Sequence, residues 1–190
     1  MLFLLKRGVL SELAVALVLG GLGWWGMATF AVPVALHLDA PALAWGVAGA
    51  LALAAWTLLV QAGFAALRGR SHAESLTVAL ARHFERASPL QMACAFAAAG
   101  GEELFFRGFV QGAWGLLAGS LAFMLAHIGP RDIRVIGYWS VAQGLGLGLL
   151  YQATGNLAVP ILAHGLFDLG AMAYFRQLMA RRRGACASSS

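Results

Sequence analysis

The chain of 190 residues is 61% hydrophobic and only 11% charged, and its mean hydropathy is +0.77. A soluble domain carries about a quarter charged residues, so this composition excludes an ordinary soluble protein and indicates a polytopic membrane protein. The two cysteines, Cys94 and Cys186, predict neither a disulfide framework nor a zinc ribbon.

Apolar segments follow one another along the chain at residues 9–36, 42–67, 90–113, 116–129, 135–153 and 157–179. Because a spanning helix needs about 20 residues, we predict an all-α membrane helix bundle with about six transmembrane segments in a single domain, residues 1–190. The fourth segment is short, so we expect it to tilt differently or to cross the membrane only partly. Four prolines lie near segment ends, where a missing N–H costs least: Pro41, Pro89, Pro130 and Pro160.

Residues 71–87 lie between the second and third segments and predict an amphipathic helix on the cytoplasmic interface. Ser71 and Glu74 have the spacing of a capping box. Leu76, Leu80 and Phe84 recur every four residues on one face. A solvated linker helix is the alternative.

The basic residues predict the orientation of the bundle. If six segments alternate from a cytoplasmic N-terminus, twelve of the 13 Lys and Arg residues face the cytoplasm and the outer loops carry none. Both termini are then cytoplasmic, and we expect the membrane to be a bacterial inner membrane. The basic residues behind the net charge of +5 are therefore interpreted as topology signals that face anionic lipid headgroups, and a nucleic-acid-binding patch is the weaker interpretation. In the fifth segment, Gly144 and Gly148 form a G-x-x-x-G pattern that lets helices approach closely.

Few ionisable residues lie deep within the segments: Glu102, Glu103, Arg107, His127, His164 and Asp168. A charge at the bilayer centre costs about 3 kcal/mol on insertion scales, so such residues are functional candidates by default. Taken alone, each one would be weak evidence, because a single buried histidine is more often a structural core residue and Glu103 with Arg107 would be a buried ion pair. Their occurrence together favours one shared site.

Helical spacing sorts these residues. Glu103 and Arg107 are four apart and can pair on one face, and His164 and Asp168 repeat the spacing. Glu102 points about 100° away from Glu103. A carboxylate in an apolar site can act as a general base, a neutral histidine can share the water, and a second histidine can donate to an oxyanion. The pattern therefore suggests hydrolysis, although the same side chains could be zinc ligands.

Three motifs carry a family resemblance. Glu102 to Arg107 fits E-E-x-x-x-R, Phe123 to His127 fits F-x-x-x-H, and His164 to Asp168 fits H-x-x-x-N/D. In this order they resemble the CPBP family of intramembrane proteases, which includes prenyl-protein (CAAX) endopeptidases and bacterial bacteriocin-processing or immunity proteins. The resemblance covers about residues 98–175.

The resemblance implies a role for each residue. Glu102 would activate water, His127 would share it, His164 and Asp168 would form the oxyanion site, and Glu103 and Arg107 would support them. It implies no metal and no cofactor. The last motif position is commonly Asn, and an ionised Asp168 cannot donate to an oxyanion. Asp168 must then be protonated or orient His164, and we expect Asp168→Asn to be tolerated.

We therefore predict a glutamic-type intramembrane endopeptidase. His164 lies about two turns from the outer face, which suits a membrane-anchored protein or peptide cut near its C-terminal anchor, as in myxosortase-like members that process sorting signals. A prenylated substrate is not excluded by the residues. The alternatives are a zinc protease using the same residues and a non-catalytic membrane binding or immunity protein. A proton-coupled transporter is disfavoured by the small size and the lack of an internal repeat.

Overall fold

A computed structural model describes residues 8–69, 77–78, 81, 87–128 and 134–187. The elements in chain order are α1 (Val9–Thr29), α2 (Ala40–Arg68), α4 (Pro89–Glu103), the π-helix η2 (Leu104–Gln111), α5 (Gly112–Trp114), α6 (Leu116–His127), α7 (Arg134–Thr154) and α8 (Ala158–Ala187). Each of the six apolar segments forms helix over most of its described residues, which confirms the all-α fold, although α1 ends at Thr29, before the predicted end at residue 36. The predicted interfacial helix at 71–87 falls almost wholly outside the described residues.

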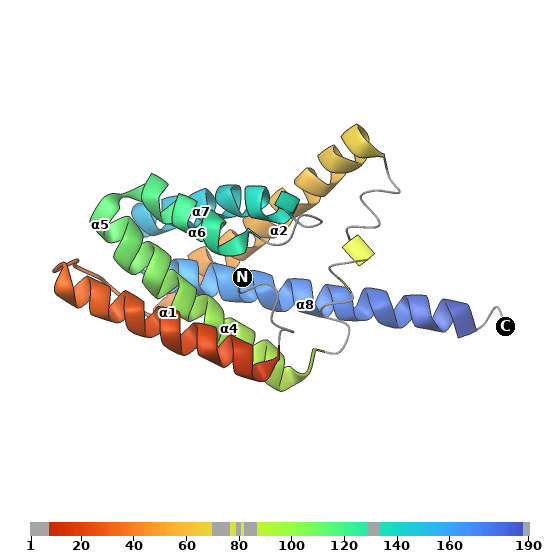
Figure 1. Ribbon diagram of the computed structural model, residues 1–190, viewed down its shortest axis with the longest axis horizontal. Coiled ribbons are helices and arrows are strands. Elements are labelled where there is room, and N and C mark those ends of the chain that lie inside the picture. Colours follow the sequence, from red (N-terminus) through yellow and green to blue (C-terminus); the bar gives the residue numbers. More distant parts are fainter. Residues whose placement is uncertain (1–7, 70–76, 79–80, 82–86, 129–133, 188–190) are drawn as a thin grey trace.

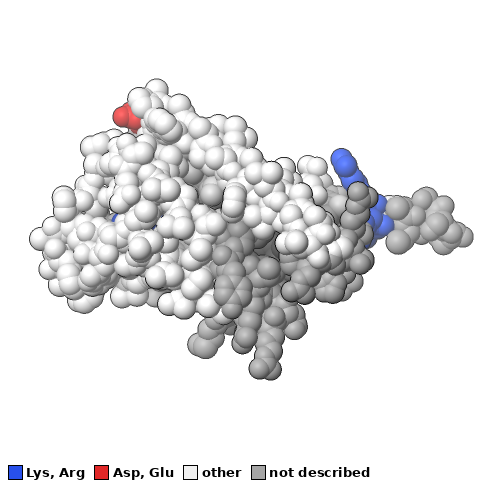
Figure 2. Space-filling model, turned by 90° about the horizontal axis from the view of Figure 1, so that it is seen from above, with Lys and Arg blue, Asp and Glu red and all other residues white. Residues whose placement is uncertain are grey.

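The described helices have the lengths and surfaces of a membrane bundle. Three of them, α1, α2 and α8, are long and apolar enough to cross a bilayer, judged by length and composition. Large apolar side chains project outward from α1 and α2, among them Leu10, Leu17, Trp24, Leu58 and Leu59. Among the described residues on the face in Figure 2 almost all are uncharged, and Lys and Arg are seen near the end where the C-terminus lies. A surface of this kind is stable in lipid rather than in water, so the protein is a membrane protein.

Helix starts follow local capping rules. The side chain of Asp39 accepts a hydrogen bond of 2.8 Å from the amide of Ala42, and the Ser88 hydroxyl accepts one of 3.1 Å from the amide of Gln91. Pro41 and Pro89 occupy the first turns of α2 and α4, where their missing N–H groups have no helical partner in any case. The placement expected for these two prolines is thereby confirmed.

The third apolar segment forms the centre of the bundle. In Figure 1 α4 lies between α1 and α8, and α6 and α7 run side by side above it. Close contact between α1 and α4 depends on Gly101, because a Cβ there would lie 2.6 Å from the carbonyl oxygen of Ala16. A Cβ on Gly144 would lie 3.2 Å from the Cα of Ser120 in α6. The close approach predicted from the G-x-x-x-G pattern is therefore observed between α6 and α7.

Two connections meet at one end of the bundle. The amide of Leu157 donates to the carbonyl of Ala35 over 2.9 Å, and the Asn156 side chain exchanges hydrogen bonds with the backbone of His37. The loops after α1 and α7 are thus on the same side, as alternating helices require. The sixth segment, α8, extends from this end to the opposite one (Figure 1).

Two irregular features lie near the charged residues. The helix that begins at Pro89 changes to π geometry over Leu104–Gln111. Such π segments are rare and occur often at functional sites. The short α6 has 12 residues and is about 18 Å long, so it cannot cross a full bilayer, as its length in the sequence predicted.

Candidate active site

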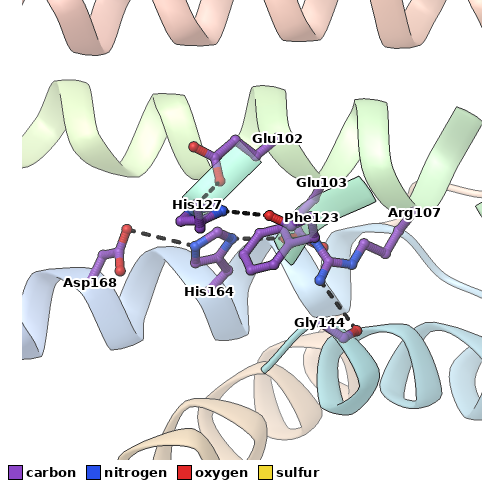
Figure 3. Close-up of polar contacts among 8 residues, drawn as sticks. All are labelled: Glu102, Glu103, Arg107, Phe123, His127, Gly144, His164 and Asp168. Atoms are coloured by element: carbon purple, nitrogen blue, oxygen red, sulfur yellow. Dashed lines mark hydrogen bonds and ion pairs between the residues drawn. The ribbon is translucent and has the colours of Figure 1, made fainter. Parts of the chain in front are cut away.

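The six ionisable residues singled out from the sequence lie together in the structure (Figure 3). Glu102 and Glu103 are the last two residues of α4, and Arg107 follows in η2. His127 ends α6, while His164 and Asp168 lie one turn apart on α8. Three separate parts of the chain therefore contribute to one polar cluster inside an apolar bundle.

Glu102 faces His127. Oε2 of Glu102 lies 3.7 Å from Nε2 of His127, and their side chains are 16% and 17% exposed. Nδ1 of His127 lies 2.8 Å from the carbonyl oxygen of Phe123, which can only accept, so Nδ1 carries the hydrogen. In the neutral imidazole, Nε2 then presents a lone pair toward Glu102. The 3.7 Å separation is too long for a direct hydrogen bond.

Glu103 connects two helices. Its Oε1 accepts a hydrogen bond of 2.7 Å from Nη1 of Arg107 and lies 2.8 Å from Nδ1 of His164. The side chains of Glu103 and Arg107 are fully buried. The predicted pairing of Glu103 with Arg107 is confirmed, but the contact with His164 was not expected. Glu103 therefore lies at the centre of a row of three polar side chains, with Arg107 on one side and His164 on the other, that joins η2, α4 and α8.

Arg107 has two further neighbours. Its Nη2 donates to the carbonyl of Gly144 over 3.3 Å, and its guanidinium carbon lies 4.3 Å from the centroid of the Phe123 ring. An arginine buried in this way needs each of these contacts, since an uncompensated charge inside a bundle is costly. Arg107 thus fixes the relative positions of η2, α6 and α7.

His164 lies between two carboxylates. An ionised Glu103 only accepts, so the hydrogen on Nδ1 of His164 belongs to the histidine. Nε2 of His164 lies 3.7 Å from Oδ2 of Asp168, and the Asp168 side chain is 30% exposed. A hydrogen on Nε2 therefore requires the doubly protonated imidazolium, which the two carboxylates would stabilise. This geometry favours the second of the two roles considered for Asp168, the orientation of His164.

Gln111 is a polar residue that charge-based reasoning missed. Its side chain is buried in η2 and its Nε2 donates to the carbonyl of Gly148 over 2.9 Å. Arg107 and Gln111 are four apart, and so are their acceptors Gly144 and Gly148. The sequence did contain a signal for Gln111, because its amide follows Arg107 by four residues and so lies on the same helix face. Both side chains reach the α7 backbone because glycines leave it uncovered.

The donor set bears on the zinc alternative. Within the described part of the chain, no three His, Cys, Asp or Glu side chains converge as the ligands of a metal ion would. The carboxylate–histidine contacts in the cluster are Glu102 with His127, and His164 with both Glu103 and Asp168. A tetrahedral zinc site would need these side chains to rearrange.

Comparisons with known proteins match the part of the chain that contains these residues. Residues 86–170 match the family model described as type II CAAX prenyl endopeptidase Rce1-like. Over 67 residues the chain is 39% identical to the uncharacterized protein YpbD of Bacillus subtilis (strain 168), a match that covers 35% of each chain. No solved structure matches the chain.

The matched region contains all six clustered residues and all three motifs. It starts just before α4 and ends just after Asp168 in α8. The chain is thus similar to the Rce1-like type II CAAX prenyl endopeptidases over residues 86–170, less than half of its length, and this match supports the resemblance to the CPBP family.

Proposed function

We propose that this protein is a glutamic-type intramembrane endopeptidase that hydrolyses a peptide bond of a membrane-anchored protein or peptide. The observation that carries the proposal is the placement of Nε2 of His127 opposite the Glu102 carboxylate. The carboxylate and the imidazole lone pair face each other over 3.7 Å, and both side chains are partly exposed. Two acceptors placed in this way can bind the two hydrogens of one water molecule and leave its oxygen lone pairs free.

The reaction follows from these roles. The water oxygen attacks the carbonyl carbon of the substrate as Glu102 takes a proton from it, and the carbonyl oxygen becomes an oxyanion. The protonated Glu102 then gives its proton to the leaving nitrogen as the carbon–nitrogen bond breaks. The first products are a carboxylic acid and an amine, which become a carboxylate and an ammonium group when the proton of the acid passes to the amine, and Glu102 is ionised again. Such positioned proton transfer contributes about 10²- to 10⁴-fold to the rate.

His164 is assigned to the oxyanion. As the imidazolium, it donates from Nδ1 to Glu103 and offers the hydrogen on Nε2 to the developing charge. Asp168 orients this imidazolium and stabilises its charge from the other side. Glu103 and Arg107 are too deeply buried to meet a substrate, and we assign them to positioning His164.

The substrate follows from depth and orientation. Glu102 lies 13 residues beyond Pro89, which is about 20 Å along the helix and past the middle of a bilayer entered from the cytoplasmic side. With both termini in the cytoplasm of a bacterial inner membrane, the site is in the outer half. We therefore propose cleavage near a C-terminal membrane anchor, such as a sorting signal.

The test compares wild-type protein with Glu102→Gln in native membranes and identifies new protein termini by mass spectrometry. Termini next to C-terminal anchors that appear only with wild type support the proposal. Purified protein in lipid nanodiscs then cuts a peptide that spans one such site, and Glu102→Gln should lose at least about 100-fold in rate while staying folded. Full activity in Glu102→Gln would favour the non-catalytic membrane binding protein. Loss of activity with a chelator, restored by zinc, would favour the zinc protease.

A further inference from the structure

The ring of Phe123 lies at the centre of the polar cluster. Phe123 is on α6, one turn before His127, and is only 1% exposed. In Figure 3 its ring lies between the Arg107 guanidinium on one side and the imidazoles of His127 and His164 on the other. Phe123 is the first residue of the F-x-x-x-H motif, but the proposed reaction gives it no role.

Each of the three neighbours meets the ring in a defined geometry. The guanidinium carbon of Arg107 lies 4.3 Å from the ring centroid, within the range of a cation–π interaction. The His127 ring stacks at 4.2 Å between centroids with an interplanar angle of 31°. The His164 ring meets Phe123 edge to face, at 5.7 Å and 69°. One ring thus restrains the planes of both imidazoles.

The backbone of the same residue acts on His127 as well. Because the Phe123 carbonyl accepts the hydrogen of Nδ1, it determines which nitrogen faces Glu102, whereas the ring determines where that nitrogen points. The distance from Glu102 to His127 and the direction of Nε2 of His164 both depend on these restraints.

We propose that Phe123 is a positioning residue for both histidines, and that its aromatic ring aligns them for reaction by packing between them and Arg107. This proposal rests on the proposed peptidase function. It goes beyond a core-packing role, because it requires an aromatic ring and not only an apolar side chain of similar volume. Misplacement of reacting groups by about 1 Å can cost about 10²-fold in rate.

Phe106 provides a matched control. It is 2% exposed, and its ring meets Phe123 edge to face at 5.3 Å. The guanidinium carbon of Arg107 lies 6.0 Å from its centroid, so Phe106 is farther from the cation than Phe123 is. Truncation of either phenylalanine leaves a similar hole in the same core.

The experiment uses the full chain in lipid nanodiscs with the variants Phe123→Leu, Phe123→Tyr and Phe106→Leu. We expect the two leucine variants to lose similar thermal stability. Phe123→Leu should lower kcat by about 10- to 100-fold with KM within about twofold. Phe106→Leu should keep most of kcat, and Phe123→Tyr, which retains the ring, should recover it. Equal kcat values in the two leucine variants, or no recovery in Phe123→Tyr, would overturn the proposal.

A second readout is independent of activity. Nuclear magnetic resonance of protein with ¹⁵N-labelled histidine side chains reports the tautomer and ring environment of His127 and His164. Phe123→Leu should shift the signals of both histidines, and Phe106→Leu should shift them much less. If the wild-type protein cuts no peptide, the peptidase proposal fails, while these shifts still decide whether Phe123 positions the histidines. Unchanged histidine signals in Phe123→Leu would refute the positioning role.

Discussion

His164 donates the hydrogen on its Nδ1 to Glu103 across 2.8 Å, and this contact joins α8 to the end of α4. The same oxygen of Glu103 accepts from Arg107, so the buried ion pair and the histidine form one unit. Such a unit can stabilise the fold, position His164, or do both. Mutations that separate the two roles are available.

Arg107→Met should be strongly destabilising, because it leaves the Glu103 carboxylate buried without its cation. We expect a loss of about 3–5 kcal/mol in the free energy of unfolding, measured by reversible denaturation in mixed micelles. The double variant Glu103→Leu/Arg107→Met replaces the whole pair with apolar groups and should recover much of that loss. It should remain inactive, because His164 then lacks the acceptor for Nδ1. An active double variant would show that Glu103 has no part in the reaction.

Asp168→Asn should retain activity. Asp168 is 3.7 Å from Nε2 of His164, beyond hydrogen-bond distance, and an amide of the same shape can accept from the imidazolium or donate to the oxyanion. We expect Asp168→Asn to stay within about threefold of the wild-type kcat, and Asp168→Ala to lose about 100-fold. The kcat of both variants is measured in lipid nanodiscs with the peptide that spans an identified cleavage site. If Asp168→Asn were as inactive as Asp168→Ala, the carboxylate itself would be needed.

The helices could be predicted from the sequence because a bilayer imposes a simple rule on them. Apolar length alone located all six segments, and the proline positions located two helix starts. The pairing of Glu103 with Arg107 was equally accessible, since an i, i+4 spacing within one helix fixes their proximity.

The contact between Glu103 and His164 could not be predicted in this way. The two residues are 61 positions apart, so their distance depends on how α4 and α8 pack. The π geometry of η2 could not be predicted either. The same holds for the partners of Arg107 and Gln111 on α7, because they too depend on how helices distant in the sequence pack together. Gln111 was missed for a second reason: the search for costly residues followed charge, and a buried amide is neutral.

Gly148→Ala should weaken the packing of α7 against η2. A Cβ at this position would lie 2.6 Å from Oε1 of Gln111, and the Gln111 amide donates to the Gly148 carbonyl. We expect a loss of about 1–3 kcal/mol in unfolding free energy, as for other overpacked sites. Gly146→Ala, on the same helix, is the control, because its Cβ would meet only Leu53 at an ordinary 3.8 Å. Equal stability of the two variants would contradict the close packing seen here.

The orientation can be tested with single cysteines. In a background with Cys94→Ala and Cys186→Ala, one variant carries His37→Cys and another carries Arg183→Cys. His37 is exposed in the loop that pairs with Asn156, whereas Arg183 is exposed at the far end of α8. We expect a membrane-impermeant maleimide to label His37→Cys in intact cells and to label Arg183→Cys only after the membrane is opened, because the predicted orientation places twelve basic residues on the cytoplasmic side.

The two outcomes of this labelling experiment separate two classes of substrate. The expected pattern puts Glu102 in the outer half of the bilayer, within reach of an anchor whose protein lies outside the cell. The reverse pattern would put the same residues in the cytoplasmic half. The reaction assigned to Glu102 and His127 would be unaffected by that result, because it depends on their 3.7 Å separation and not on depth. The preference for an extracytoplasmic protein with a C-terminal anchor would be lost, and cytoplasmic lipid-anchored proteins would become the substrates to examine.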